Sequence, residues 1–160
     1  GEILWKYLNN VYENVDSYGE PQRFDMAAVM KESYINADII DSSDADVISA
    51  GDFEKKRVCT QFPYGWECTK GEGKLEIKAE FQNLGILYFA TTNGLGGQYD
   101  VYVDGEYAGT INADFSDGWG NAIKAKQVYI SDSSAEHTIT IKKSPDSTGD
   151  LFDLLGLLVS

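Results

Sequence analysis

The sequence is poor in the residue types that metal and nucleophilic chemistry require. It has one histidine, His137, and two cysteines, Cys59 and Cys68, in 160 residues. The two cysteines do not form a Cys-x-x-Cys motif, and no second cluster completes a zinc site. No Gly-x-Ser-x-Gly elbow and no Gly-Asp-Ser motif is present, so a serine hydrolase would lack an identifiable nucleophile. His137 shares the core-facing side of a predicted strand with Ile139 and Ile141, which indicates a structural role.

Positive charge and long hydrophobic runs are also scarce. The chain has 13 Lys and Arg against 26 Asp and Glu, a formal net charge of -13. Such a surface repels phosphate backbones and acidic membranes, so nucleic acid and membrane are disfavoured as partners, whereas neutral, hydroxyl-rich ligands are not penalised. No apolar run reaches the roughly 18 residues of a membrane span. The acids offer many pairs for glycoside hydrolysis, but none lies in an apolar context that would raise its pKa.

The two cysteines flank a segment that can form a hairpin. Pro63 and Gly65 between them are turn formers, so Cys59 and Cys68 can pair across its stem as a disulfide. A disulfide would place the protein in an oxidising compartment. The alternative is two unrelated thiols in a cytosolic protein.

Residues 1–36 are predicted to form a helical segment or linker packed on the following domain. Apolar residues recur at three- and four-residue steps between Ile3 and Val15, which predicts an amphipathic helix, and a second helix is expected from Asp25. These helices either cap the domain or end a preceding one. The chain begins at Gly1 without a signal peptide, which is expected of a trimmed fragment or a mature product.

Residues 37–160 are predicted to form one antiparallel β-sandwich or jelly roll, so the fold class is mainly β. The segment 74–82 alternates strictly between apolar and charged residues, as a half-buried strand does. Asp104-Gly105 is a strong hairpin signal. Within 122–130 the apolar residues change from odd-numbered to even-numbered positions, which indicates a β-bulge. The expected strands are 74–82, 85–90, 99–103, 106–111, 122–130, 137–142 and 151–159.

The long loops are predicted to share one end of this sandwich. Antiparallel strands alternate in direction, so every second loop lies at the same end of the sandwich. This places the loops 92–97, 112–121 and 144–149 together, and the same alternation towards the N-terminus adds the segment 63–66. Flat aromatic rings can stack on sugar rings, and amides can hydrogen-bond the hydroxyls. Each tryptophan could instead plug the core, but Trp119 is flanked by Gly118 and Gly120, which leave its ring uncrowded. The candidate ligand-binding residues are Trp119, Trp66, Tyr64, Asn121, Asn93 and Gln98.

The β-rich part resembles the galactose-binding-like β-sandwich of carbohydrate-binding modules. The matching segments are 99–105, 118–120, 137–141 and 152–156. They are similar to accessory modules of bacterial esterases and glycoside hydrolases that act on plant cell walls. The resemblance implies a non-catalytic, secreted or cell-surface module of a larger polypeptide that binds a β-glucan, xylan or mannan type of polysaccharide, at a chain end or internally. A structural or protein-docking domain of such an enzyme is the alternative.

The same resemblance makes calcium a candidate structural cofactor, because such modules often hold one. No aspartate-rich loop here has the spacing of an EF-hand. The acids at Asp38, Asp41, Asp44 and Asp46 are expected to form a solvated loop instead.

Overall fold

The computed structural model describes residues 5, 6, 8, 9, 12 and 36–160. The chain divides into two units, 1–32 and 33–160. The described positions of the first unit are helical, and the rest of the predicted helix between Ile3 and Val15, like the helix expected from Asp25, lies outside the described residues. Among the described residues there is no helix long and apolar enough to cross a membrane.

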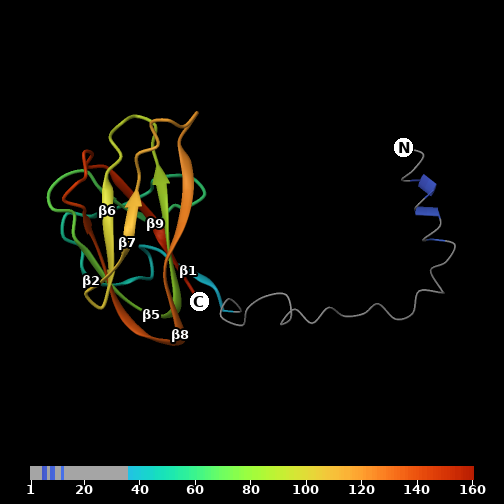
Figure 1. Ribbon diagram of the computed structural model, residues 1–160, viewed down its shortest axis with the longest axis horizontal. Coiled ribbons are helices and arrows are strands. Elements are labelled where there is room, and N and C mark those ends of the chain that lie inside the picture. The colour runs from blue at the N-terminus through green and yellow to red at the C-terminus, as the bar shows by residue number, and fades with distance from the viewer. Residues whose placement is uncertain (1–4, 7, 10–11, 13–35) are drawn as a thin grey trace. The chain divides into compact units, whose positions relative to one another are not determined.

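Over residues 36–160, the second unit has nine β-strands, drawn in Figure 1. They are β1 (Asp38–Ile40), β2 (Asp46–Ser49), β3 (Glu54–Lys56), β4 (Gly65–Cys68), β5 (Leu75–Ala90), β6 (Gln98–Val103), β7 (Glu106–Asn112), β8 (Ala122–Lys143) and β9 (Phe152–Val159). All strand pairs among them are antiparallel. The predicted fold class, a mainly β antiparallel sandwich, is confirmed.

Two long strands connect the two layers of the sandwich. The pairing of β5 with β8 begins at Leu75 opposite Ile141 and ends at Ala90 opposite Ala122. The register shifts near Asn83. The first half of β5 and the second half of β8 lie in one layer with β2, β6 and β7, whereas their other halves lie with β9 and its neighbours β1 and β4. Figure 1 shows β8 curving around the lower end of the domain between the layers. Both ends of each long strand therefore lie at the same end of the sandwich.

The bend joins strands that the sequence predicts to be separate. The strands expected at 74–82 and 85–90 form the single strand β5, and those expected at 122–130 and 137–142 form the single strand β8. Gln82 Nε2 donates to the carbonyl of Ser131 at 3.0 Å, and Asn83 Nδ2 donates to Ser160 Oγ at 3.0 Å. These side chains satisfy polar groups where the ladder is irregular, so each strand bends without reversing. The predicted bulge in 122–130 is confirmed, because Leu84 faces Tyr129 while Gly85 faces Gln127.

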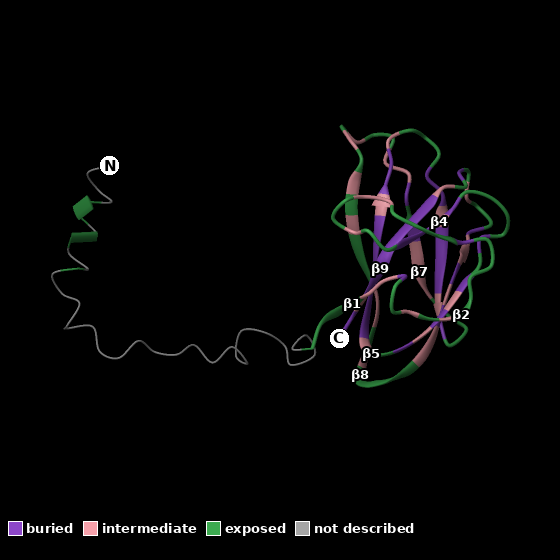
Figure 2. Cartoon of the chain, turned by 180° about the vertical axis from the view of Figure 1, so that it is seen from behind, coloured by how far each residue is buried: buried purple, intermediate pink, exposed green. Residues whose placement is uncertain are grey.

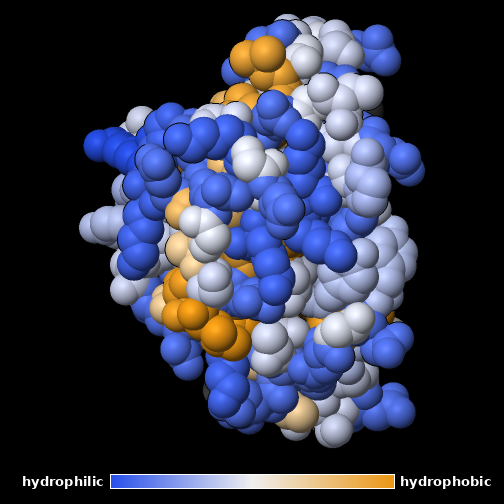
Figure 3. Space-filling view, turned by 90° about the vertical axis from the view of Figure 1, so that its left-hand side faces the viewer, coloured by the Kyte–Doolittle hydropathy of each residue, from blue (hydrophilic) through white to orange (hydrophobic). Residues whose placement is uncertain are grey.

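The core lies between the two layers and follows the predicted alternation. Leu75, Ile77, Ala79 and Phe81 are all buried. β9 is almost wholly buried, as predicted, and Tyr99 stacks on its Phe152 with ring centroids 4.5 Å apart. Figure 2 shows this burial along β9, with exposed residues concentrated in the loops and along part of β8. The face in Figure 3, on the side of β2, is mainly hydrophilic with a few separate hydrophobic patches.

The hairpin turn between β6 and β7 closes the end opposite the long loops. Asp104 and Gly105 adopt φ values of 51° and 85°, the left-handed values that a tight two-residue hairpin requires. The Asp104 carboxylate contacts His137 Nδ1 at 2.7 Å and accepts from the Thr138 amide at 2.8 Å. The hydrogen bond with His137, followed by that from Thr138, lowers the pKa of Asp104. His137 thus has the structural role that its place in the strand predicts.

The predicted disulfide between Cys59 and Cys68 is wrong, since both residues are free thiols. The hairpin stem is shorter than expected: Glu54 faces Glu67 and Lys56 faces Gly65. Continuing this register places Phe53, rather than Cys59, opposite Cys68. The Cys68 thiol is buried and donates to the carbonyl of Lys70 at 3.3 Å.

Asp153 is a buried carboxylate on the otherwise apolar strand β9, which corrects the expectation that no acid lies in an apolar context. It is 6% exposed, and its Oδ1 has no hydrogen-bond partner. Burial, assisted by the negative charge of Glu67 on the neighbouring strand, raises the pKa of Asp153 to about 6. Lys56 opposes this shift. An unpaired buried charge destabilises the folded state, so Asp153 costs stability wherever it is ionised.

We expect Asp153→Asn to stabilise the domain at pH 7.5 and to change little at pH 4. The folded pKa lies above the ordinary value of 3.8, so the wild-type protein loses stability as the pH rises from about 4 to about 6. The difference at pH 7.5 is on the order of 2 kcal/mol. Urea unfolding at both pH values measures it. The exposed Asp132→Asn is the matched control, and equal unfolding curves for Asp153→Asn and wild type at both pH values would contradict the expectation.

Candidate functional site

Three long loops meet at one end of the sandwich, as predicted, and are hydrogen-bonded together. They are 91–97, 113–121 and 144–151. The amide of Thr91 donates to the carbonyl of Ala113 at 3.0 Å, and the amide of Gly97 donates to the carbonyl of Leu151 at 2.8 Å. Loop 91–97 therefore lies between the other two. These backbone bonds give the loop end a defined shape, and Figure 1 shows long loops at the upper end of the domain.

Trp119 projects fully into solvent from loop 113–121. Below it, the amide of Gly118 donates to the carbonyl of Phe115 at 2.7 Å. A Cβ on Gly118 would lie 2.5 Å from the Phe115 ring, so the loop closes tightly over that ring. Lys124 Nζ lies 3.4 Å from the centre of the Phe115 ring, a cation–π contact. The Trp119 ring is thus exposed on a loop whose base is well packed.

The predicted asparagines fix the same loops. Asn121 Oδ1 accepts from the amide of Thr92 at 2.9 Å, which joins loop 113–121 to loop 91–97. Asn93 Oδ1 accepts from the amide of Leu95 at 2.9 Å and shapes its own loop. Within the part of the chain that the structure describes, the amide nitrogens of both asparagines lack a protein partner. Each therefore remains a free donor at this exposed surface.

Gln98 begins β6 at the same end and anchors the third loop through its main chain. Its amide donates to Ser147 Oγ at 2.8 Å, and its carbonyl accepts from the amide of Ser144 at 2.9 Å. The residue is half-buried. Trp119, Asn121, Asn93 and Gln98 thus all belong to the loop end.

Trp66 and Tyr64 do not belong to it, which corrects the prediction for both. Trp66 is 1% exposed and pairs with Leu154 in the core, so its ring cannot meet a ligand. The prediction did not include strand β4, which runs from Gly65 towards the loop end at Cys68. Tyr64 precedes β4 and so lies at its far end, where its carbonyl accepts from the amide of Ser42. The loop that joins the shared end is 69–74.

A cavity of about 280 Å³ opens beside loop 91–97 at the loop end. It is lined by Thr69, Gly94, Leu95, Thr148, Gly149, Asp150 and Leu151. Leu95 is an exposed apolar side chain at its edge. The sequence predicts two of the loops that form this cavity, 91–97 and 144–151, but not its lining residues, because the residues that point inward depend on the hydrogen bonds between loops.

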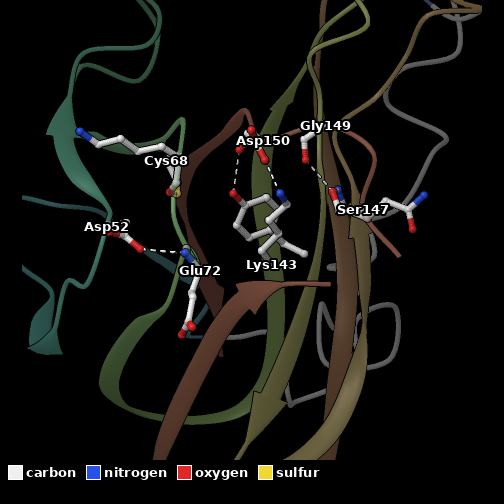
Figure 4. A network of polar contacts seen from close by, with 11 residues as sticks. Asp52, Cys68, Glu72, Lys143, Ser147, Gly149 and Asp150 are labelled. Carbon is white, nitrogen blue, oxygen red and sulfur yellow. Dashed lines mark hydrogen bonds and ion pairs between the residues drawn. The ribbon is translucent and has the colours of Figure 1, made fainter. Parts of the chain in front are cut away.

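A network of polar contacts includes Gly149 and Asp150, which line this cavity (Figure 4). The hydroxyl of Tyr99 donates to the carbonyl of Asp150 at 2.7 Å, and the Asp150 carboxylate forms an ion pair with Lys143. Burial raises the pKa of Tyr99, so its hydroxyl stays a donor at any physiological pH. Asp52 accepts from the amides of Glu72 and Gly73, which holds loop 69–74 in place. The polar groups of this network are therefore already held in place by contacts within the protein.

The acidic loop does not fit a metal. Among residues 36–160 and the few described before them, no group of three or more His, Cys, Asp or Glu side chains is placed to hold an ion. Asp41 Oδ1 accepts from the amide and hydroxyl of Ser43, and Asp44 Oδ1 accepts from the amide of Asp41. These carboxylates close their own turn, as aspartates commonly do.

Among the described residues, no hydroxyl or thiol is hydrogen-bonded to His137 Nε2. His137 lies between the rings of Phe81 and Tyr129, with centroids at 4.6 and 5.3 Å. Its Nε2 is buried and makes no hydrogen bond to any described residue. An Asp104–His137 pair without a hydroxyl or thiol at Nε2 lacks the geometry of a catalytic triad.

Comparison with known proteins shows the fold. No family model matches the chain, and no curated protein matches its sequence. A two-domain esterase active on acetylated mannans has a TM-score of 0.72 and 18% identity over 89% of this chain. A family two carbohydrate esterase from Cellvibrio japonicus has a TM-score of 0.56 and 15% identity over 77%. The CBM36-1 domain of a multidomain xylanase from the hindgut metagenome of Trinervitermes trinervoides has a TM-score of 0.54 and 12% identity over 78%.

The extent of these matches differs between the neighbours. This chain spans 40% of the two-domain esterase and 33% of the second esterase, but 97% of the CBM36-1 domain. The β-sandwich of this chain thus has the same fold as the CBM36-1 domain and as part of each of the two esterases. Fold alone does not assign a ligand, because one scaffold can host many sites.

We expect Gly118→Ala to disturb the Trp119 loop, whereas Gly120→Ala leaves it unchanged. The new Cβ at residue 118 meets the Phe115 ring, while nothing lies within 4 Å of a Cβ at residue 120. Overpacking of this kind costs roughly 1–3 kcal/mol. Thermal unfolding together with the fluorescence of Trp119 measures the effect, and equal behaviour of the two variants would contradict the packing described for this loop.

Proposed function

We propose that this domain is a non-catalytic carbohydrate-binding module whose ligand lies on the loop end. The observation that carries the proposal is the fully exposed ring of Trp119 on a packed loop. A tryptophan left entirely in water forgoes the favourable burial of a large apolar ring. Such a residue on a rigid loop is explained by a partner that covers it.

The surroundings of Trp119 suit a saccharide. The ring offers a flat apolar face for the C–H groups of a pyranose, and Asn121 and Asn93 provide amide donors for its hydroxyls. Across loop 91–97, the cavity adds the hydroxyls of Thr69 and Thr148 and the exposed side chain of Leu95. Apolar contact together with a few directional polar groups is the usual composition of a small-molecule site.

The proposed ligand is a plant cell-wall polysaccharide of the β-glucan, xylan or mannan type. In support, the names of the structural neighbours refer to acetylated mannans and to a xylanase. We further propose that the domain belongs to a larger secreted or cell-surface polypeptide and directs a bacterial hydrolase or esterase to its substrate. A ligand without charge is compatible with a net charge of -13.

The second candidate is a structural or protein-docking domain. An open cavity of about 640 Å³ on the β1, β5, β8 and β9 side favours it. Its lining includes Ala37, Ile39, Leu84 and Leu158. Apolar surface of this kind can receive a neighbouring domain. This candidate predicts that no glycan in a broad array binds and that removal of Trp119 has no effect on assembly.

We expect Trp119→Ala to lower affinity for the ligand polysaccharide at least tenfold while the domain stays folded. Loss of an aromatic stacking surface accounts for roughly 1.5 kcal/mol or more of binding free energy. The melting temperature should change little, because the ring makes no buried contact. Affinity electrophoresis in gels containing mannan, xylan or β-glucan measures the change. Tyr107→Ala, at another exposed ring, is the matched control, and unchanged retardation of Trp119→Ala in the gel that retards wild type would refute this site.

A further inference from the structure

A basic pocket lies on a different part of the domain from the loop end. It has a volume of about 350 Å³, at the lower end of the range for small-molecule sites. Its lining comes from the turn before β2, from β3 and the residue after it, and from the segment before β4. The lining residues are Ser42, Ser43, Lys55, Lys56, Arg57, Pro63 and Tyr64. We name this set the Arg57 pocket.

The charge of the Arg57 pocket is opposite to that of the whole protein. Three successive cations, Lys55, Lys56 and Arg57, line it, although the chain carries twice as many acids as bases. Charges of one sign gathered in a concave site attract a ligand of the other sign more strongly than the same charges spread over a surface. The pocket therefore selects an anion, which the rest of the acidic surface disfavours.

The three cations differ in the partners that their side chains have within the protein. Lys56 forms an ion pair with Glu67, and that hydrogen bond raises the pKa of Lys56. Lys55 Nζ donates to the carbonyl of Ser42 at 2.5 Å, an uncharged partner. Arg57 is exposed and makes no ion pair or hydrogen bond with any residue that the structure describes. The guanidinium is thus the group left to bind a ligand, and its planar fork matches a carboxylate.

The carboxylates beside Ser42 and Ser43 are already occupied. Asp41 and Asp44, on the turn that carries Ser42 and Ser43, accept hydrogen bonds from that turn itself. They reduce the positive potential of the pocket without reaching Arg57 as partners. Because every group here is partly exposed, the attraction for an anion should weaken as salt rises.

The pocket also has features that a bare anion would not use. The Tyr64 side chain is 55% exposed and offers a ring face beside Pro63. Ser42 and Ser43 also line the pocket, and the Ser42 amide donates to the Tyr64 carbonyl at 3.3 Å. A flat ring, small polar groups and an unpaired guanidinium together fit a sugar ring that carries a carboxylate. Tyr64, which the sequence singled out as a ligand-binding residue, would bind there rather than beside Trp119.

We propose that the Arg57 pocket is a second saccharide site that binds a hexuronate unit. Its carboxylate pairs with Arg57, with Lys55 nearby, and its ring contacts Tyr64. The proposal rests on the proposed carbohydrate-binding function and names an acidic sugar as part of the ligand. Neutral backbone units at Trp119 and acidic units at the Arg57 pocket would let one acidic polysaccharide engage both sites, and two linked sites raise the overall affinity beyond either alone.

The test is calorimetric titration of the domain with tetragalacturonate and with its methyl ester, at low and at physiological salt. We expect binding of the acid only, weakened by salt. Arg57→Gln should lower affinity at least tenfold and Arg57→Lys by less, because the ammonium cannot pair in a bidentate manner. Tyr64→Ala should also weaken binding. Lys78→Gln, which removes the same charge from an exposed lysine paired with Glu136, should leave affinity unchanged.

Further measurements distinguish a hexuronate site at the Arg57 pocket from a general anion site and from binding at Trp119. Equal affinity for the methyl ester, or for a glutamate oligopeptide, would overturn the assignment of a hexuronate. Tetragalacturonate binding that survives Arg57→Gln but is lost in Trp119→Ala would overturn the Arg57 pocket while the proposed function stands. A neutral mannan or xylan oligosaccharide bound by Arg57→Gln and lost in Trp119→Ala, together with acid binding lost in Arg57→Gln, would support both sites. Failure of every saccharide to bind would overturn both.

Discussion

The arrangement of the whole domain depends on the pairing of β5 with β8 along their full length. Both strands bend near Asn83 and pass from one layer to the other, so each begins and ends at the same end of the sandwich. At the bend the Gln82 side chain donates to the Ser131 carbonyl, so a backbone group that the irregular ladder leaves open is satisfied and the strands bend without reversing. As a consequence, the loops that follow β5, precede β8 and follow β8 all meet at one end.

The loop end acquires its shape from hydrogen bonds between loops and not from secondary structure. Asn121 joins two of these loops, and the chain of contacts through Tyr99, Asp150 and Lys143 supports the third. Such a preformed surface lowers the conformational cost of binding a flexible ligand. Trp119, on the loop that closes over the Phe115 ring, is the exposed ring of this surface.

Electrostatics divides the surface into two regions of different preference. The overall charge of -13 makes an uncharged saccharide the most compatible ligand for most of the molecule. The Arg57 pocket is the local exception, because a free guanidinium and two ammonium groups line one concavity. The buried carboxylate of Asp153 shows the opposite situation, in which a charge is placed where water cannot compensate it.

The sequence by itself determined the mainly β fold, the core-facing alternation in 74–82, the Asp104-Gly105 hairpin and the bulge in β8, because these follow from local periodicity and turn chemistry. It also predicted that three of the long loops, 91–97, 113–121 and 144–151, cluster and that Trp119 belongs to them. Only the tertiary structure decided that Trp66 is core, that Tyr64 lies apart and that Cys59 and Cys68 do not pair. These outcomes depend on one short strand, β4, and on its register with β3 and β9. Such register is set by contacts between segments far apart in the chain, which periodicity within one segment cannot reveal.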